Sequence, residues 1–220
     1  MDNNIVTRDE WLQARAALRA EEKALTAARA ALAAKRRALP WVRVMEAYRF
    51  LGPEGEATLV DLFAQQSQLL VYHFMLGPGW EAPCPGCSQW AAAIHGTATQ
   101  FARADARLVV ISRAPLAEIE RVQRQMGWDF DWYSSFESRF NYDFFVSNED
   151  QGKDSSVDIT ASDGTAERVF FDRGENHGVS VFVKNAAGEV CHAYSAYNRG
   201  IEELNGAMGY LDLLPKGRTW

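Results

Sequence analysis

The sequence lacks the features of secreted and membrane-spanning proteins. It has only three cysteines in 220 residues, too few for a secreted domain held together by disulfides. Its longest apolar run, 69–76, is far shorter than the roughly 18 residues that a membrane-spanning helix needs. The first dozen residues contain acids and no apolar stretch, unlike a secretory signal. We therefore expect a cytoplasmic protein with no membrane partner.

Positive charge is also scarce. The chain has 23 Lys and Arg against 29 Asp and Glu, a net charge of −6, and no basic patch of the kind that binds nucleic acid. Apolar residues make up 47% and charged residues 24%, as in ordinary globular proteins. A chain of this length can bury a core without a metal or a disulfide. We expect no nucleic-acid partner, no metal and no cofactor.

Residues 1–40 are expected to form a long helix that extends from the rest of the chain. Thr7 and Glu10 have the spacing of a capping box, and Pro40 is a plausible stop after Leu39. One apolar stripe repeats every seven residues, through Trp11, Leu18, Leu25, Leu32 and Leu39. A coiled-coil seam needs a second apolar position in each heptad, and the residues at that position are only weakly apolar or charged here. The helix could therefore lie along its own domain or a partner subunit, which suggests a homodimer, or form an independent coiled coil.

Residues 41–220 alternate between strand and helix patterns. The apolar runs 69–76 and 108–111 read as buried strands, separated by a helix over 88–104 and followed by a helix over 116–126. This order predicts a βαβ crossover and a parallel pair of strands.

Three further segments complete this domain. Segments 179–183 and 189–194 flank a turn and predict a hairpin, and 201–211 predicts a last helix. The aromatic segment 127–148 has no clear period, so we expect an irregular cover, and the polar segment 149–165 is expected to be exposed. Together these elements predict a three-layer α/β domain.

One motif, Cys84-Pro85-Gly86-Cys87, carries chemistry. It stands between the first apolar strand and a helix, with Cys84 at the N-cap and Pro85 at the first helical position. The free N–H groups of Gly86 and Cys87 and the helix dipole would then stabilise a Cys84 thiolate. Cys87 would lie on the same helix face, where it can attack a mixed disulfide formed on Cys84.

Other interpretations of these cysteines remain open. A zinc site would need further ligands, such as His73, His177, His192 or Cys191, brought in by the fold. The pair could also be buried and inert. We expect Cys191 and His73 to be core residues, and His177 could support the motif. A c-type haem is excluded, because Ser88 stands where a histidine is required.

The chain resembles the bacterial family of predicted dithiol–disulfide oxidoreductases, whose substrates are unknown to us, within the thioredoxin-like superfamily. The resemblance covers roughly residues 5–217. It is carried by the stretches 37–41, 68–75, 77–80, 84–88, 112–115, 126–128, 140–144, 178–182, 194–197 and 210–212. It implies a thioredoxin-like α/β/α sandwich with a central mixed sheet, an N-terminal helical extension and a redox-active pair, Cys84 and Cys87.

The chain departs from thioredoxin at one position. Thioredoxins have a cis-proline just before the hairpin strand, where Gly178 stands here, and no proline lies between Pro115 and Pro215. This difference weakens the case for general reduction of protein disulfides and leaves room for peroxidase-like or small-molecule thiol chemistry.

Our preferred hypothesis is a thiol–disulfide oxidoreductase with Cys84 as nucleophile and Cys87 as resolving thiol. Trp80 and the 127–145 segment would shield the site, and Arg113 would add positive potential. The partner would be a small-molecule or protein thiol or disulfide, and the sequence does not identify the reductant. The alternatives are a peroxiredoxin-like peroxidase that forms a sulfenic acid on Cys84, or a non-enzymatic binding or oligomerisation module.

Overall fold

The computed structural model describes residues 4–150 and 153–218, and the chain divides into two units, Met1–Pro40 and Trp41–Trp220. The first unit is essentially one helix, α1 (Arg8–Arg37). The expected capping box is present, because Thr7 accepts from the backbone of Glu10 and the Glu10 carboxylate accepts from Thr7. No residue of α1 is buried, and its leucines are 42–52% exposed. The homodimer expected from this stripe stays a prediction.

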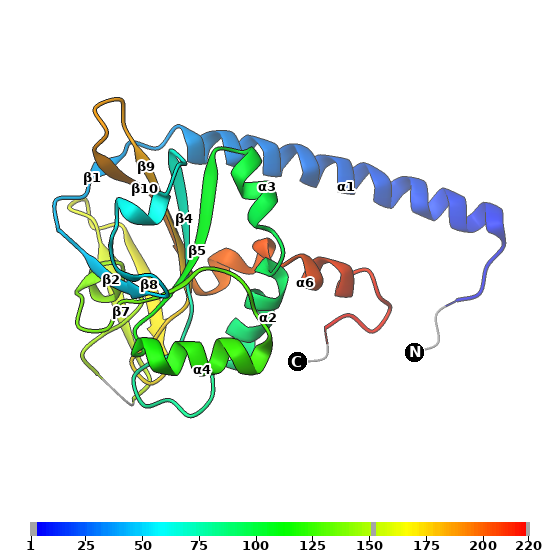
Figure 1. Cartoon of the computed structure of the whole chain (residues 1–220). Coiled ribbons are helices and arrows are strands. Elements are labelled where there is room, and N and C mark those ends of the chain that lie inside the picture. Colours follow the sequence, from blue (N-terminus) through cyan, green and yellow to red (C-terminus); the bar gives the residue numbers. More distant parts are fainter. Residues whose placement is uncertain (1–3, 151–152, 219–220) are drawn as a thin grey trace. The chain divides into compact units, whose positions relative to one another are not determined.

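The second unit is built on a mixed eight-stranded sheet (Figure 1). The strand order is β1-β10-β9-β4-β5-β6-β2-β3, in which β4–β5 and β5–β6 are parallel and the other neighbours are antiparallel. The strands are β1 (Val42–Arg43), β2 (Arg49–Gly52), β3 (Gly55–Thr58), β4 (Gln68–His73), β5 (Ala106–Ser112), β6 (Trp132–Ser134), β9 (Gly178–Lys184) and β10 (Val190–Tyr197).

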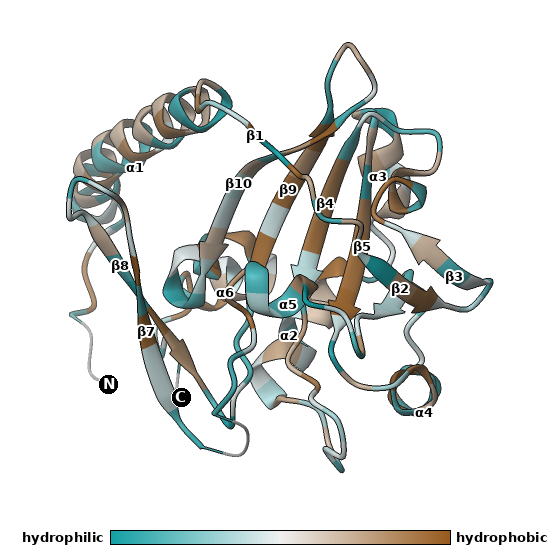
Figure 2. Cartoon of the chain, turned by 90° about the vertical axis from the view of Figure 1, so that its left-hand side faces the viewer, coloured by the Kyte–Doolittle hydropathy of each residue, from teal (hydrophilic) through white to brown (hydrophobic). Residues whose placement is uncertain are grey.

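The centre of the sheet follows the apolar runs of the sequence. Figure 2 shows β4, β5 and β9 as the most hydrophobic strands, and both expected buried strands and the hairpin are present. The chain passes from β4 through α2 (Pro85–Ile94) and α3 (Ala98–Arg103) to the parallel strand β5. The βαβ crossover is therefore confirmed.

Helical segments cover both faces of the sheet and make three layers. On one face, α2, α4 (Leu116–Met126) and η2 (Asn198–Leu204) pack against alternate strand residues such as Tyr72 and Val110. On the other, η1 (Asp61–Phe63) and α5 (Phe140–Asp143) pack against the residues between them, such as Val71 and Val109. The period of two along β4 thus sends Tyr72 toward α2 and Val71 away from it.

Several sequence predictions need correction. The helix predicted over 88–104 begins at Pro85 and breaks at Gly96, whose φ of +78° suits glycine but not a continuing helix. The described residues of the polar segment 149–165 are mostly exposed, as expected, but they also include a strand, β7 (Ser155–Thr160), which pairs with β8 (Ala166–Phe171) in a separate two-stranded sheet (Figure 2). The helix predicted over 201–211 is divided between η2 and α6 (Gly206–Leu211).

A chain of four polar side chains crosses β4, β9 and β10. His73 Nε2 lies 2.8 Å from Ser180 Oγ, Ser180 Oγ lies 2.8 Å from Ser195 Oγ, and Ser195 Oγ lies 2.8 Å from His192 Nε2. His73 and Ser180 are buried, and burial together with His192 lowers the pKa of His73 to about 3. His73 is therefore a neutral, hydrogen-bonded core residue.

Two kinds of feature are absent from residues 4–150 and 153–218. No helix there is both long and apolar enough to cross a membrane. No three or more His, Cys, Asp or Glu side chains there are grouped so that they could hold a metal ion.

Candidate active site

The dithiol motif sits where a loop from β4 enters helix α2. Cys84 is the N-cap residue and Pro85 occupies the first turn, as the spacing predicts. The Cys84 carbonyl accepts hydrogen bonds of 3.0 Å from both the backbone N–H and the hydroxyl of Ser88. Helix α2 thus starts directly at the first cysteine, and the N–H groups of its first turn have no partner within the helix.

The Cys84 thiol is a strong acid for a cysteine. A hydrogen bond from the Cys87 side chain, with further bonds from the backbone N–H groups of Cys87 and Gly86, lowers the pKa of Cys84 to about 6. Burial and the nearby Asp172 carboxylate oppose this shift. Cys84 is half-buried and unbridged. At pH 7 it is therefore mostly a thiolate, the form that attacks disulfides.

Cys87 has the opposite character. Its side chain is 1% exposed, and burial, followed by the hydrogen bond and the charge of Cys84, raises its pKa well above the usual range. The Tyr72 hydroxyl and the Met75 backbone act in the other direction. The structure therefore brings together a charged outer sulfur and a protonated inner one, the division of roles that the motif predicts.

Trp80 lies in the segment that leads into the dithiol motif. It belongs to the loop between β4 and α2, and with Cys84 it packs on the core cluster that contains Cys87. The Arg173 guanidinium lies 3.7 Å from the centre of the Trp80 ring. Arg121 from α4 donates to the Trp80 and Glu81 carbonyls and so anchors the loop. The shielding role expected for Trp80 stays a prediction.

The oxidoreductase hypothesis requires Arg113 to add positive potential at the dithiol, whereas the structure places Arg113 in an ion pair. It follows β5, and its Nε donates to Glu175 Oε1 at 2.7 Å. Glu175 is 1% exposed and also accepts from the Ser147 hydroxyl. The positive charge of Arg113 is thus largely compensated by Glu175, and the pair fixes the segment before β9 to the end of β5.

Gly178 begins β9, where its lack of a side chain has a packing reason. It pairs with His73 on β4 and Tyr197 on β10. A Cβ atom here would lie 2.7 Å from the Ala196 carbonyl oxygen and 2.8 Å from the Tyr197 ring. The glycine therefore allows β10 to approach closely, and the supporting role expected for it at the dithiol stays a prediction.

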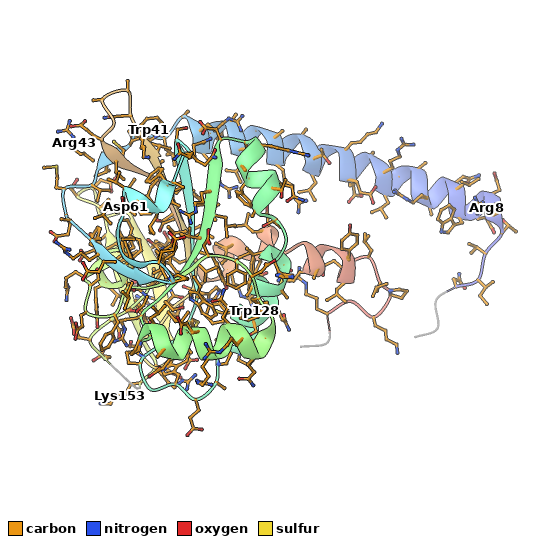
Figure 3. All side chains as sticks on the ribbon, in the orientation of Figure 1. Arg8, Trp41, Arg43, Asp61, Trp128 and Lys153 are labelled. Carbon is orange, nitrogen blue, oxygen red and sulfur yellow. The ribbon has the colours of Figure 1, made fainter. Side chains whose placement is uncertain are left out.

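The aromatic segment 127–148 is divided between the two faces of the sheet. Trp128, Phe130 and Trp132 join the cluster around Cys87, and Figure 3 places Trp128 near α2 and α4. Phe140 and Phe144 pack on the opposite face. Only the first part of the segment therefore lies on the side of the dithiol. Trp132 in that part belongs to strand β6, which was not predicted from the sequence.

Two residues of the site were not found from the sequence. Asp172 acts on Cys84 through its charge, and Tyr72 acts on Cys87. Asp172 follows β8. Because the surface of β8 is polar, the sequence did not predict a strand there, and no signal in the sequence pointed to Asp172. Tyr72 could have been found, because the alternation along β4 places it on the face that α2 covers.

Comparison with solved structures supports the fold. Xanthomonas campestris peroxiredoxin Q is 14% identical, with a TM-score of 0.50, over 76% of this chain and 95% of that one. A Xylella fastidiosa PrxQ mutant gives 14% identity and a TM-score of 0.48 over 74% and 88%. A protein proposed to be the thiol:disulfide interchange protein DsbE of Chlorobium tepidum gives 11% and 0.45 over 78% and 94%.

These similarities concern the fold alone, which is a thioredoxin-like α/β fold with a central mixed sheet. None of the curated proteins compared with this chain matches it. The sequence does match one protein family over residues 1–220. The chain therefore belongs to DUF899, a family described as bacterial proteins of unknown function.

Proposed function

We propose that this protein is a thiol–disulfide oxidoreductase in which Cys84 attacks a disulfide and Cys87 resolves the intermediate. The observation that supports this most directly is the arrangement of the two sulfurs. Cys84 is a stabilised thiolate at the start of α2, and the buried Cys87 thiol donates to it. A low-pKa attacking thiol beside a second thiol is what disulfide exchange requires.

The exchange proceeds in two steps. The Cys84 thiolate attacks one sulfur of the substrate, which breaks the substrate disulfide, forms a mixed disulfide on Cys84 and releases one substrate thiolate. Cys87 then loses its proton to the medium and attacks the Cys84 sulfur. The second substrate thiolate leaves, so the substrate gains two electrons and the protein dithiol becomes a disulfide.

The substrate class is a disulfide of a small molecule or a protein. The cytoplasm is the compartment we propose, because it keeps such a dithiol reduced between turnovers.

A peroxidase reaction at Cys84 is less well supported. A peroxide-reducing thiolate would benefit from a cation and a hydroxyl beside the sulfur. The charged side chain that acts on Cys84 in the described structure is the Asp172 carboxylate, which disfavours the thiolate. We therefore keep peroxide reduction as the alternative outcome of the test.

The test is a single turnover with one equivalent of dithiobis(nitrobenzoate), which releases a coloured thiolate at each step. Wild-type protein should release two equivalents, Cys87→Ser one, with the adduct retained on Cys84 by mass spectrometry, and Cys84→Ser almost none. Cys191→Ala, which removes a buried cysteine of β10, is the matched control and should behave as wild type.

Rapid release from Cys84→Ser would refute the mechanism. Fast oxidation of Cys84 by peroxide, with dimedone trapping of a sulfenic acid and no exchange with disulfides, would favour the peroxidase instead.

A further inference from the structure

Tyr72 reaches the dithiol from beneath, on the central strand β4. Its side chain is 1% exposed and belongs to the cluster that contains Cys87. The ring stacks on Trp90 of α2 with centroids 6.3 Å apart and planes 27° apart. The strand below and the helix above therefore hold the phenol in one position, with little freedom for its hydroxyl to move elsewhere.

The Tyr72 hydroxyl has an unusual environment. Among residues 4–150 and 153–218 it has no hydrogen-bond partner of normal geometry, sulfur atoms included. The group that acts on it directly is the Cys87 thiol. A buried hydroxyl without a partner is costly, and a neutral thiol is only a weak acceptor. A thiolate is a strong acceptor, so the Tyr72 hydroxyl gains a good partner only when Cys87 ionises.

We propose that Tyr72 is a catalytic residue of the resolving step, in which its hydroxyl donates a hydrogen bond to the Cys87 sulfur as that sulfur loses its proton and attacks the mixed disulfide. This role rests on the proposed exchange reaction and deepens it, since it concerns the second thiol.

The resolving step needs such a donor because Cys87 is buried. Once Cys84 is bound in a mixed disulfide its negative charge is gone, and burial remains the main obstacle to ionising Cys87. The Tyr72 hydroxyl and the Met75 backbone remain to stabilise the new thiolate. The other charge that acts at this site is Asp172, beside Cys84.

Tyr72 keeps its own proton throughout. Burial, followed by the charge of Cys87, raises the pKa of Tyr72 well above its usual range. The phenol therefore donates a hydrogen bond and is not the base. The proton of Cys87 leaves to the medium before the attack.

The test compares Tyr72→Phe with wild type in the single turnover with dithiobis(nitrobenzoate). The variant keeps the ring that stacks on Trp90 and removes only the hydroxyl. Losing a hydrogen bond to an ionised acceptor should raise the pKa of Cys87 by about 1–2 units. Higher nucleophilicity offsets part of the lost thiolate, so the second release should slow about 3- to 15-fold at neutral pH. Its pH profile should move upward, and the first release, by Cys84, should be unchanged.

Tyr48→Phe is the matched control. It removes the hydroxyl of another buried tyrosine, which belongs to the cluster on the opposite face of the sheet and donates to Asp143 at 2.7 Å. Both releases should remain at the wild-type rate in this variant.

Each remaining result decides against the proposal. An unchanged second release and pH profile in Tyr72→Phe would show that the hydroxyl is not used. Slowing of both releases together with a lower midpoint of urea unfolding would assign Tyr72 to packing. Failure of the exchange reaction itself looks different, since wild-type protein would then give no second release.

Discussion

Replacing Cys87 by alanine should make Cys84 a weaker acid, although Cys84 itself is untouched. The Cys87 side chain is the largest single cause of the low Cys84 pKa, ahead of the backbone N–H groups of α2. A hydrogen bond to a charged acceptor contributes about 1.5–3 kcal/mol, and one pKa unit corresponds to about 1.4 kcal/mol. The pKa should therefore rise from about 6 to roughly 7–8.

The consequence is largest near neutral pH. At pH 7 a thiol with a pKa of about 6 is about 90% ionised, and one with a pKa of 8 is about 10% ionised. Alkylation by iodoacetamide, followed across pH in a Cys191→Ala background, reports this thiolate fraction for Cys84 alone. Cys87→Ser, which keeps a hydroxyl donor, should retain a low pKa.

Two results would refute this reasoning. If Cys84 titrates near 6 in Cys87→Ala as well, the helix N-terminus alone stabilises the thiolate. If Cys84 of the wild-type chain titrates between 8 and 9, the arrangement at the start of α2 does not activate it at all.

Three further predictions concern stability, each measured as the free energy of unfolding in urea. His73 has a pKa of about 3 in the folded protein, below its ordinary 6.5. Its contribution to the free energy of unfolding is therefore complete above pH 6.5 and is lost as pH falls, by about 1.4 kcal/mol per pH unit. His73→Asn should flatten that slope, and an unchanged slope would contradict the assignment. Gly178→Ala should cost about 1–3 kcal/mol, because its Cβ would meet the β10 backbone, whereas Gly209→Ala in α6 meets nothing within 4 Å and should gain about 0.5–1 kcal/mol. Equal effects of the two alanines would be inconsistent with the packing. Arg113→Met at pH 7 should cost about 3–5 kcal/mol, because it leaves a buried carboxylate uncompensated. Arg168→Met, at an exposed and solvent-screened pair, should cost far less, and similar losses in the two variants would argue against the buried pair.

The central elements could be predicted because their patterns are local. Helix α4 has the predicted bounds, since Pro115 precedes it and Gly127 ends it with a φ of +67°. Strands β4 and β5 could be predicted from continuous apolar runs, because a strand needs such a run only where both faces of its sheet are covered. The position of Cys84 as N-cap likewise follows from the order of strand, Pro85 and helix.

The elements that were missed depend on distant parts of the chain. Strand β6 has three residues and gains its hydrogen bonds from β5 and β2, so its own sequence shows no period. Strands β7 and β8 lie outside the main sheet and bury mainly Val169 and Phe171, so they resemble an exposed loop. Asp172 and Tyr72 are 88 and 12 positions from Cys84, and only tertiary packing brings their influence to the dithiol.

The hydrogen bonds of the histidine–serine chain across β4, β9 and β10 all donate in the same direction. Its three links need three protons, and the two serines supply two, so one imidazole must donate and the other must accept. Nδ1 of His73 is buried without a partner among the described residues, so that imidazole is better placed to hold its single proton on Nε2 and donate to Ser180. Protonating His192 would turn each hydroxyl around and force the proton of His73 onto Nδ1, stranding an N–H in the core. A charge added on β10 would thus reverse a whole row of dipoles and move a proton on β4, two strands away.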